Sequence, residues 1–443
     1  MSDAAPRAGH VVSFIDIGTN SVRMMVVRLN PNLSYTVLSQ EKEMVRLGAG
    51  GFDDMFLRRD AIDRTVLVCR KFVELSRYYG ADEIIAVATS AAREAGNQNV
   101  LVERLREDVG VELGIISGIE EARLVFLGVA SGLELADRTA LMIDIGGGST
   151  ELALGTGRGH EYLDSLKLGA IRMTDLFIPR GHQGAVSEKT YAAMKKHVRG
   201  YMSQATRCIR KSHTDVAIGS SGTIVNLSEM AVRSLGGQPG TLRLSHLRKL
   251  ASTIRSFMLK ERRMLPGINP ERADIIIGGA AVLEAIMEEL RIDELRVSER
   301  GVREGLLVDY LARIEGSPHA QGKGVRETSI LQLGRSCDVD EGHAATVERL
   351  SLSIRPVRPG CTTSGTRSGS SCDMPPTSMT WATSSRSPTI IYIPTTSSGT
   401  PTSWCSTRRR WPSWPPWPAI TARRRPAART RNWPDWIRRP MRP

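Results

Sequence analysis

The sequence predicts an α/β protein in which two similar domains face each other across a cleft. The main observation is an internal repeat: FIDIGTNSVRMMVV at residues 14–27 returns as MIDIGGGSTELALG at residues 142–155. Each copy reads as an apolar strand, an Asp-Ile-Gly tripeptide, a small polar turn and a second strand, with Asp16 and Asp144 at the same offset. Around the two copies, strand patterns alternate with helix patterns, which favours hairpins joined to crossover helices.

The first half of the chain holds five predicted strands and three predicted helices. The helix at 60–79 is the clearest, because its apolar residues recur at spacings of three and four. The strands are expected at 11–18, 21–29, 34–45, 83–91 and 113–118, and the helices at 60–79, 99–110 and 120–133. Together they predict a first domain over residues 1–136.

The second half continues the alternation and predicts a second domain over residues 137–315. Its strands are expected within 139–148, 149–157 and 215–222, its helices at 187–210, 222–235, 245–259 and 271–290, and a strand followed by a final helix within 294–311. The segment EGSPHAQGKG at 315–324 is typical of a linker and leads into a third region, residues 316–352.

The composition excludes several classes of protein. The apolar share of 41% suits a globular protein, and no run of about 18 apolar residues predicts a membrane span. The N-terminus lacks the apolar segment of a signal peptide. Six scattered cysteines without a CxxC pair argue against a disulfide scaffold and a zinc site. A cytoplasmic location is therefore expected.

The basic character of the chain belongs to its last part. Residues 353–443 contain fifteen arginines, no lysine and two acids, so their formal charge of +13 equals that of the whole chain. All seven tryptophans also lie there, and no amphipathic period is visible. Nucleic-acid binding is not predicted, because the rest of the chain is neutral. The stretch is predicted to be a disordered basic tail.

Three glycine-rich turns follow predicted strands and point to phosphate binding. They are DIGTNS at 16–21, DIGGGSTE at 144–151 and GSSGT at 219–223. Glycine lets backbone N–H groups approach an anion, and small hydroxyl residues add further donors. A single such turn is usually an ordinary hairpin. Two matched copies and a third turn favour a phosphate site.

The acids beside these turns point to a cation. A carboxylate aimed at a polyanion makes sense with a bound cation or as a base that orients water. Asp144 and Glu151, on neighbouring strands of one hairpin, are the candidate Mg²⁺ ligands. The alternative is that each aspartate only caps its own turn.

Seven motifs in fixed order give the sequence a specific resemblance. They are FIDIGTNSVRMMV, AVATSAAREAGN, ISGIEEARLVFLGV, MIDIGGGSTELALG, LKLGAIRMT, AIGSSGTI and SERGVREGLL. They resemble the exopolyphosphatase/guanosine pentaphosphate phosphohydrolase family of the acetate kinase, Hsp70 and actin superfamily, over about residues 11–315. The resemblance implies two actin-like (ribonuclease H-like) domains flanking a cleft.

The resemblance also implies roles for particular residues. The family's catalytic glutamate matches Glu121, although GIEEAR offers Glu120 beside it, and two acids are also common at a helix N-terminus. Arg93 matches a basic residue that reaches the terminal phosphates; its alternative is a solvated helix charge. The full phosphate-binding set comprises Asp16, Gly18, Thr19, Asn20, Ser21, Arg23, Arg93, Gly146, Gly147, Gly148, Ser149, Gly219, Ser220, Ser221, Gly222 and Thr223.

Many relatives carry a helical HD-like domain after the phosphatase core, and its start resembles residues 327–351. Beyond about Leu352, codons read from their third base permit amphipathic segments such as HAAYLHDVGDFIS, which contains His-Asp. The hypothesis is that residues 353–443 are a frameshifted, non-native tail and that 316–352 begin a truncated HD-like domain. Gene sequencing through codons 345–360 tests it. Truncation would also weaken a homodimer.

The predicted function is a hydrolase that releases the terminal phosphate of polyphosphate or guanosine pentaphosphate by metal-assisted attack of water. A non-catalytic regulator that binds (p)ppGpp or polyphosphate is the alternative. An ATP-dependent sugar or acetate kinase shares the fold, but no acceptor pocket is recognisable. The sequence leaves the choice between the two substrates open.

Overall fold

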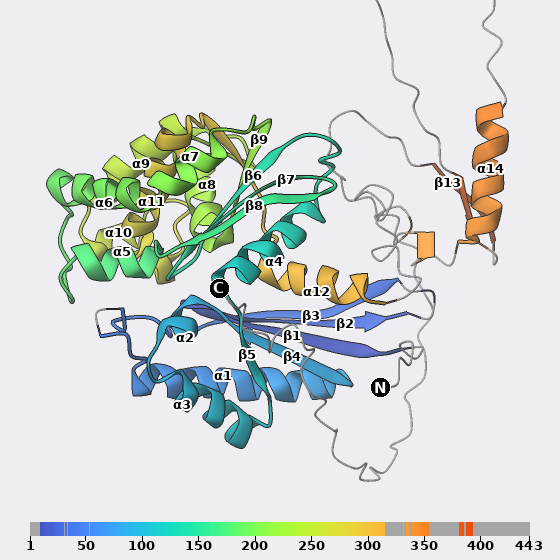
Figure 1. Cartoon of the computed structure of the whole chain (residues 1–443), viewed down its shortest axis with the longest axis horizontal. Helices are drawn as coiled ribbons and strands as arrows, with labels where there is room; N and C mark the ends of the chain where they lie inside the picture. Colours follow the sequence, from blue (N-terminus) through green and yellow to red (C-terminus); the bar gives the residue numbers. More distant parts are fainter. Residues whose placement is uncertain are drawn as a thin grey trace, which may run out of the picture. The chain divides into compact units, whose positions relative to one another are not determined.

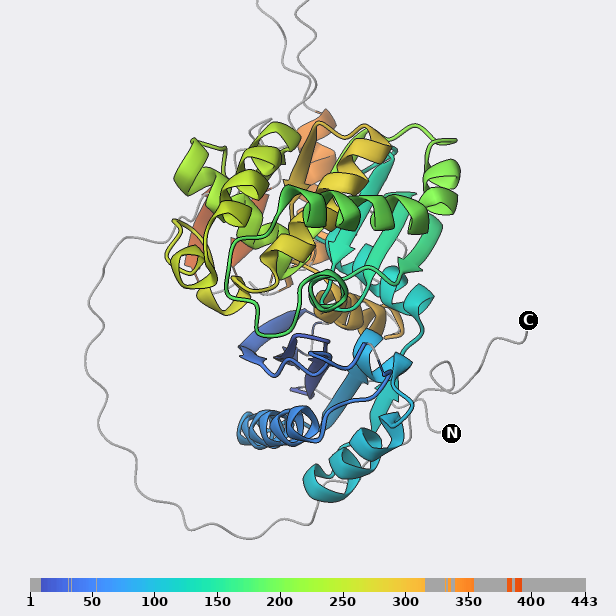
Figure 2. The same ribbon diagram turned by 90° about the vertical axis from the view of Figure 1, so that its left-hand side faces the viewer.

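The computed structural model describes residues 9–314 except 31, 33 and 53, and beyond them residues 331, 334–335, 339–353, 381–384 and 387–392. The chain divides into two compact units. The larger contains two mixed sheets with their helices, and the smaller lies within Leu333–Arg429. Figures 1 and 2 show the two sheets of the larger unit as two halves, here called lobe I and lobe II.

Lobe I is built on a five-stranded sheet in the order β3-β2-β1-β4-β5. The strands β1, β2 and β3 form two antiparallel hairpins, whereas β1, β4 and β5 run parallel. Its elements are β1 (Val11–Ile17), β2 (Ser21–Leu29), β3 (Tyr35–Met44), α1 (Arg59–Tyr78), β4 (Glu83–Ala88), α2 (Ser90–Glu94), α3 (Gln98–Arg104), the π-helical turn η1 (Leu105–Val109) and β5 (Leu113–Ile115).

Lobe II repeats this topology and adds one strand. Its sheet has the order β10-β11-β9-β6-β7-β8, so that β8-β7-β6-β9-β11 corresponds to β3-β2-β1-β4-β5. Its strands are β6 (Ala140–Ile145), β7 (Thr150–Thr156), β8 (Gly159–Leu166), β9 (Val216–Ser220), β10 (Thr241–Arg243) and β11 (Glu294–Val297). The internal repeat of the sequence is therefore a repeat of the fold.

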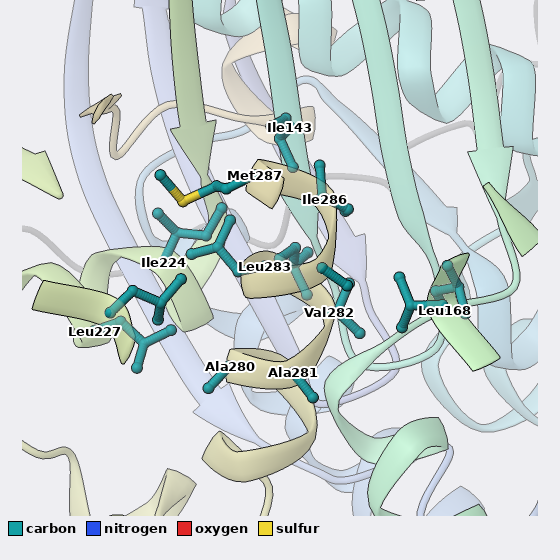
Figure 3. Packing of buried hydrophobic residues seen from close by; sticks show 14 of the residues in the cluster. Ile143, Leu168, Ile224, Leu227, Ala280, Ala281, Val282, Leu283, Ile286 and Met287 are labelled. Carbon is teal, nitrogen blue, oxygen red and sulfur yellow. The ribbon is translucent and has the colours of Figure 1, made fainter. Parts of the chain in front are cut away.

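The core of lobe II is centred on the helix α11 (Ile276–Leu290). Residues 276–287 of this helix are all buried, and apart from Glu284 they are apolar or glycine, so other elements surround the helix. Figure 3 shows Val282, Leu283 and Ile286 packed among side chains of β6 and α8. The other helices of the lobe are α5 (Ala170–Phe177), α6 (Glu188–Tyr201), α7 (Ser203–Ile209), α8 (Ser221–Leu235), α9 (Leu244–Ser256), α10 (Leu259–Arg262) and the 3₁₀ turn η2 (Pro270–Arg272).

Two helices lie between the sheets, α4 (Gly118–Ala130) and α12 (Val302–Ala312) (Figure 1). They pack backbone to backbone: a Cβ on Gly305 would lie 2.0 Å from the carbonyl oxygen of Leu124. Leu306 and Leu307 of α12 join the apolar face of β1 and β2, so α12 packs on lobe I although it follows lobe II in the chain. The glycine allows the close crossing that places α4 beside both sheets.

Some element boundaries differ from the sequence-based prediction, and two elements were not predicted. The strand expected over 83–91 ends at Ala88, and the short helix α2 begins at Ser90. The helix expected over 187–210 is two helices, α6 and α7, which meet at Met202. The strand β8 and the helix α5 were not expected, because β8 alternates weakly and α5 is short. In the described part of the chain, no helix is long and apolar enough to cross a membrane.

The smaller unit contains the helix α14 (Glu341–Ser353) and an antiparallel pair, β12 (Trp381–Ser384) and β13 (Ser387–Tyr392). The helix overlaps the end of the region assigned to an HD-like domain, but most of 316–338 lies outside the described residues. Apart from β12 and β13, residues 354–443 lie outside them too. The HD-like domain, the disorder of the tail and the frameshift stay predictions.

Candidate functional site

The two repeated turns have the same geometry and touch each other. In each, the glycine after the strand donates its N–H to a serine carbonyl: Gly18 to Ser21 at 3.0 Å and Gly146 to Ser149 at 2.9 Å. A Cβ on Gly147 would lie 2.9 Å from the Thr19 side chain, too close for an ordinary contact. The turns at residues 18–21 and 146–149 are therefore in direct contact across the lobes, and glycine permits it.

These turns present backbone donors that nothing in the protein uses. Within the described residues, the N–H groups of Thr19, Asn20, Gly147, Gly148 and Ser149 make no hydrogen bond. Thr19, Asn20 and Ser149 are at most 6% exposed. Buried N–H groups are almost always paired, and several that remain free on adjoining turns are suited to binding an anion.

Strand register arranges the charged side chains in one row on each sheet. In lobe I, Asp16 is paired with Arg23, and Arg23 with Lys42. In lobe II, Asp144 is paired with Glu151 on one side and with Ser220 on the other. Directly paired residues point to the same face of a sheet. Lobe I thus presents an acid followed by two cations, whereas lobe II presents two acids side by side.

The two aspartates near the strand ends, Asp16 buried and Asp144 partly buried, are costly to ionise. Burial raises the pKa of Asp16 to about 6, with Arg23 opposing the rise and Asp144 adding to it. Among the residues that the structure describes, the Oδ1 atom of Asp16 has no hydrogen-bond partner. Burial also raises the pKa of Asp144, but the hydroxyl of Ser220 donates to its Oδ2 at 2.6 Å and opposes that rise.

Of the two neighbouring glutamates on α4, Glu121 faces the turns. Its side chain is buried and accepts a hydrogen bond from Nη1 of Arg93 at 2.9 Å. Burial raises the pKa of Glu121 to about 7, opposed by Arg93 and reinforced by Asp16 and Asp144. Glu120 instead forms an ion pair with Arg123 at 2.7 Å. The helical periodicity of the sequence could have indicated Glu121 rather than Glu120, because Glu121 shares the buried face with Leu124 and Val125.

Glu151 completes a group of four mutually destabilising carboxylates. It is 1% exposed and accepts a hydrogen bond from the Ser165 hydroxyl at 2.8 Å. Burial, followed by repulsion from Glu121 and Asp144, holds the pKa of Glu151 well above its usual range. Such a group of carboxylates stays charged only if nearby cations balance it. Otherwise some of its members bind protons and become neutral.

The carboxylates fit a hydrated divalent cation. In the part of the chain that the structure describes, no three acidic, histidine or cysteine side chains are grouped closely enough to hold a metal together. Mg²⁺ commonly keeps several waters and is bound through one or two carboxylates. The oxygen donors of Asp144 and Glu151, and the unpartnered oxygen of Asp16, suit that mode of binding.

The structure adds two cations that the sequence did not reveal, Lys42 and Arg272. Arg272 lies against Gly222 of the third turn, where a Cβ would be 2.3 Å from its Nη2 atom. Burial, and then repulsion by Arg23, lowers the pKa of Arg272 to about 10. Burial, and then Arg272 and Arg23, lowers the pKa of Lys42 to about 8.

Arg23 attracts the carboxylates of Asp16 and Asp144, but among the described residues none of these three cations is in direct contact with an acid. Over the described ranges, the side chains of Arg23, Lys42 and Arg272 make no hydrogen bond or ion pair. Arg272 is buried, only 6% exposed, whereas Arg23 is partly buried and Lys42 is exposed. A buried charge is normally paired, so an unpartnered Arg272 beside two further cations is suited to a strongly negative ligand. Only Arg23 could be proposed from the sequence, because Arg272 is brought in by the tertiary fold.

The third turn, residues 219–223, lies between the lobe II row and Arg272. The Ser221 hydroxyl donates to the carbonyl of Ile145 at 2.6 Å, and Ser221 itself adopts a positive φ of 79°. The helix α8 begins at Ser221, so its first N–H groups have no partners within the helix. The turn therefore lies beside Asp144 on one side and Arg272 on the other, and adds a helix N-terminus suited to phosphate. Thr223 packs against Gly279.

Comparisons with known proteins show which family the chain resembles. A family model described as the Ppx/GppA phosphatase family matches residues 25–314. "Exopolyphosphatase 1" of Mycobacterium leprae is 30% identical over 74% of this chain and 96% of its own length. "Exopolyphosphatase 1" of Mycobacterium tuberculosis is 29% identical over 72% of this chain and 94% of its own.

Solved structures lead to the same group of proteins. The crystal structure of an exopolyphosphatase from Cytophaga hutchinsonii superposes with a TM-score of 0.64 and 26% identity, covering 69% of this chain and 99% of that one. The Ppx/GppA family member of Aquifex aeolicus has a TM-score of 0.57 at 25% identity, covering 70% and 99%.

Proposed function

The chain belongs to the Ppx/GppA phosphatase family, and we propose that it removes the terminal phosphate from inorganic polyphosphate, guanosine pentaphosphate or both. The resemblance found in the sequence and the fold of two actin-like lobes are thereby confirmed. The observation that carries the proposal is the arrangement of opposite charges. A row with two free cations faces a row of acids, and the free N–H groups of two touching turns lie between them.

The terminal phosphate occupies the paired turns in this proposal. The free N–H groups of Thr19, Asn20 and Gly147 bind its oxygens, and Arg93 contributes positive charge beside them. Arg23, Lys42 and Arg272 hold the phosphates that follow along the chain. The row runs from Asp16 toward Lys42, so the chain enters with one end and extends toward the cations. This orientation supports attack at the chain end.

Glu121 is the proposed general base. Its pKa of about 7 gives a substantial carboxylate population at neutral pH together with useful basicity. The carboxylate takes a proton from water as the water oxygen bonds to the terminal phosphorus. The bond from that phosphorus to the bridging oxygen breaks, and the shortened chain leaves with the electron pair. Mg²⁺ held by Asp144 and Glu151 would supply charge neutralisation for the phosphoryl oxygens.

The test compares two adjacent glutamates. Glu121→Gln should lower kcat by about 10²–10⁴-fold, because the amide keeps the shape but cannot accept the proton. Glu120→Gln, whose ion pair with Arg123 lies outside the turns, is the matched control and should stay near wild type. Phosphate release is measured with Mg²⁺ from long-chain polyphosphate and from guanosine pentaphosphate in parallel.

Three results would contradict the proposal. Unchanged phosphate release by Glu121→Gln would remove that residue from the chemistry. Binding of both substrates by the wild type without any release would favour a regulator. Loss of ATP only in the presence of a phosphate acceptor would favour a kinase.

A further inference from the structure

Arg172 lies where the two lobes meet, and the proposed chemistry does not use it. It belongs to LKLGAIRMT at residues 166–174, a motif of the family resemblance to which the sequence assigned no role. Its position in the first turn of α5 leaves it 7% exposed. An arginine so deeply buried requires partners for its charge and its donors.

The guanidinium of Arg172 has three partners from three different segments. Its Nε atom donates to the carbonyl of Gly148 at 2.7 Å, and Nη2 donates to Oε1 of Glu94 at 2.6 Å. Its plane lies over the ring of Phe52, with Cζ 4.1 Å from the ring centroid. Gly148 belongs to lobe II, whereas Glu94 and Phe52 belong to lobe I, so one side chain joins the two.

The ion pair between Arg172 and Glu94 is not explained by a contribution to folding stability alone. The side chains are 8% and 10% exposed, so both charges have lost most of their water. Burial lowers the pKa of Arg172, and Glu94 opposes the fall. A buried pair contributes little net stability, although breaking it is costly. Its fixed geometry is the more useful property.

That geometry acts on the free donors of the second turn. The peptide unit is planar and trans, so the N–H of Ser149 points opposite to the carbonyl of Gly148. By holding that carbonyl, Arg172 also fixes the direction of the Ser149 N–H, one of the five unengaged donors. Without this contact, the peptide unit between Gly148 and Ser149 could rotate more easily, because glycine allows many backbone conformations.

The same geometry acts on the candidate base through α2. Glu94 and Arg93 are neighbours in this five-residue helix. Glu94 contacts Arg172, and Arg93 donates to Glu121 at 2.9 Å and to the Ile116 carbonyl at 3.0 Å. Lys167, from the same motif as Arg172, approaches Glu94 at 3.2 Å. The position of α2, and with it that of Arg93, is therefore tied to lobe II.

We propose that Arg172, through Glu94 and the Gly148 carbonyl, is a positioning residue that aligns the anion-binding turn with the base during hydrolysis. This inference rests on the proposed function. It predicts that loss of Arg172 lowers turnover more than substrate binding, since Arg23, Lys42 and Arg272 bind the chain independently.

The decisive variant is Arg172→Lys, which keeps the charge but cannot make the forked contacts. It should lower kcat on polyphosphate by about 10-fold or more and change KM less than about 3-fold. In Arg172→Ala, added guanidinium ion should partly restore kcat, whereas tetramethylammonium at the same ionic strength should not. Glu94→Gln combined with Arg172→Ala should lower kcat by less than the product of the single effects.

Lys195→Met supplies the matched control, because Lys195 forms a comparably buried ion pair with Glu284 at 2.5 Å, away from both turns. It should lower the melting temperature and leave kcat unchanged. The inference is overturned if Arg172→Lys keeps wild-type kcat, or if its loss of kcat is no larger than that of Lys195→Met. Equally, a rise in KM alone would make Arg172 a binding residue. Failure of the wild type to release phosphate would instead contradict the proposed function.

Discussion

The two lobes have the same strand topology but opposite chemistry at matched positions. Asp16 and Asp144 end corresponding strands, and each is followed by the same hydrogen-bonded turn. Across the hairpin, however, Arg23 in lobe I takes the place of Glu151 in lobe II. One strand further, Lys42 takes the place of Ser165.

This difference shows how a repeated backbone can serve two purposes. In the proposed function, the turns repeat because both contribute N–H groups to one anion, and backbone donors do not depend on side-chain identity. The side chains beside them diverge because a polyphosphate chain and a metal cation require opposite charges. In this proposal the side chains of the lobe I hairpin are assigned to the substrate and those of the lobe II hairpin to the metal, with Glu121 between them on α4.

The variant expected to have the largest effect, and so the strongest test of the division between substrate and metal binding, lies in lobe II. Glu151→Gln keeps the hydrogen bond from Ser165 but removes the charge assigned to Mg²⁺. It should lower kcat by about 10²-fold and raise the Mg²⁺ concentration for half-maximal activity by about 10–100-fold. Activity is measured against total Mg²⁺, with the exposed Glu161→Gln on the adjacent strand as control. An unaltered Mg²⁺ requirement would place the metal elsewhere.

The part of this site that follows local pattern could be predicted from the sequence. The repeat specified the strand–turn–strand units, because alternating apolar residues and a glycine turn act within one hairpin. It therefore indicated Asp16, Asp144 and the turns, and the structure brings these together. The assignment of Glu121 required the family resemblance, although the helix phase of α4 separates it from Glu120.

The rest depends on tertiary contacts that no local pattern contains. Arg272 comes from a short 3₁₀ turn and reaches Gly222 only because η2 packs beside the start of α8. Lys42 stands in an edge strand where a lysine is usually solvated. The sequence assigned Arg172 neither a helix nor a role, because its contacts form only where α5 packs against lobe I. Contacts between residues that are far apart in the chain produce no periodic pattern in the sequence.

A smaller effect, in substrate affinity, is expected from lobe I. Arg23→Gln should raise KM for long-chain polyphosphate by about 10-fold with little change in kcat, since a charge-assisted contact to phosphate is worth about 1.5–3 kcal/mol. Arg28→Gln, on the exposed side of the same strand, is the control. Initial rates are measured at fixed ionic strength. If Arg23→Gln lowered kcat and left KM unchanged, the two lobes would not divide substrate from metal binding as assigned.

The smallest effect concerns stability, and it distinguishes the two matched aspartates. Asp16 has a pKa raised to about 6, so the folded protein binds its proton more tightly than the unfolded chain. Stability from this group is present below about pH 4 and falls as pH rises through about 6, by on the order of 3 kcal/mol. Asp16→Asn removes the titration. Its melting temperature in chelator should exceed that of the wild type by several degrees at pH 7.5 and approach it near pH 4.5.

Asp144 should respond less to the same substitution, because the Ser220 hydroxyl already stabilises its charged form and the amide of Asp144→Asn would accept that hydrogen bond only in part. The measurement is the difference in melting temperature between each variant and the wild type across that pH range. A larger pH-dependent gain for Asp144→Asn than for Asp16→Asn would show that the unpartnered Oδ1 atom of Asp16 does not carry the destabilisation. The hairpin assigned to the metal, rather than the hairpin assigned to the substrate, would then bear the greater electrostatic cost of ionising its aspartate.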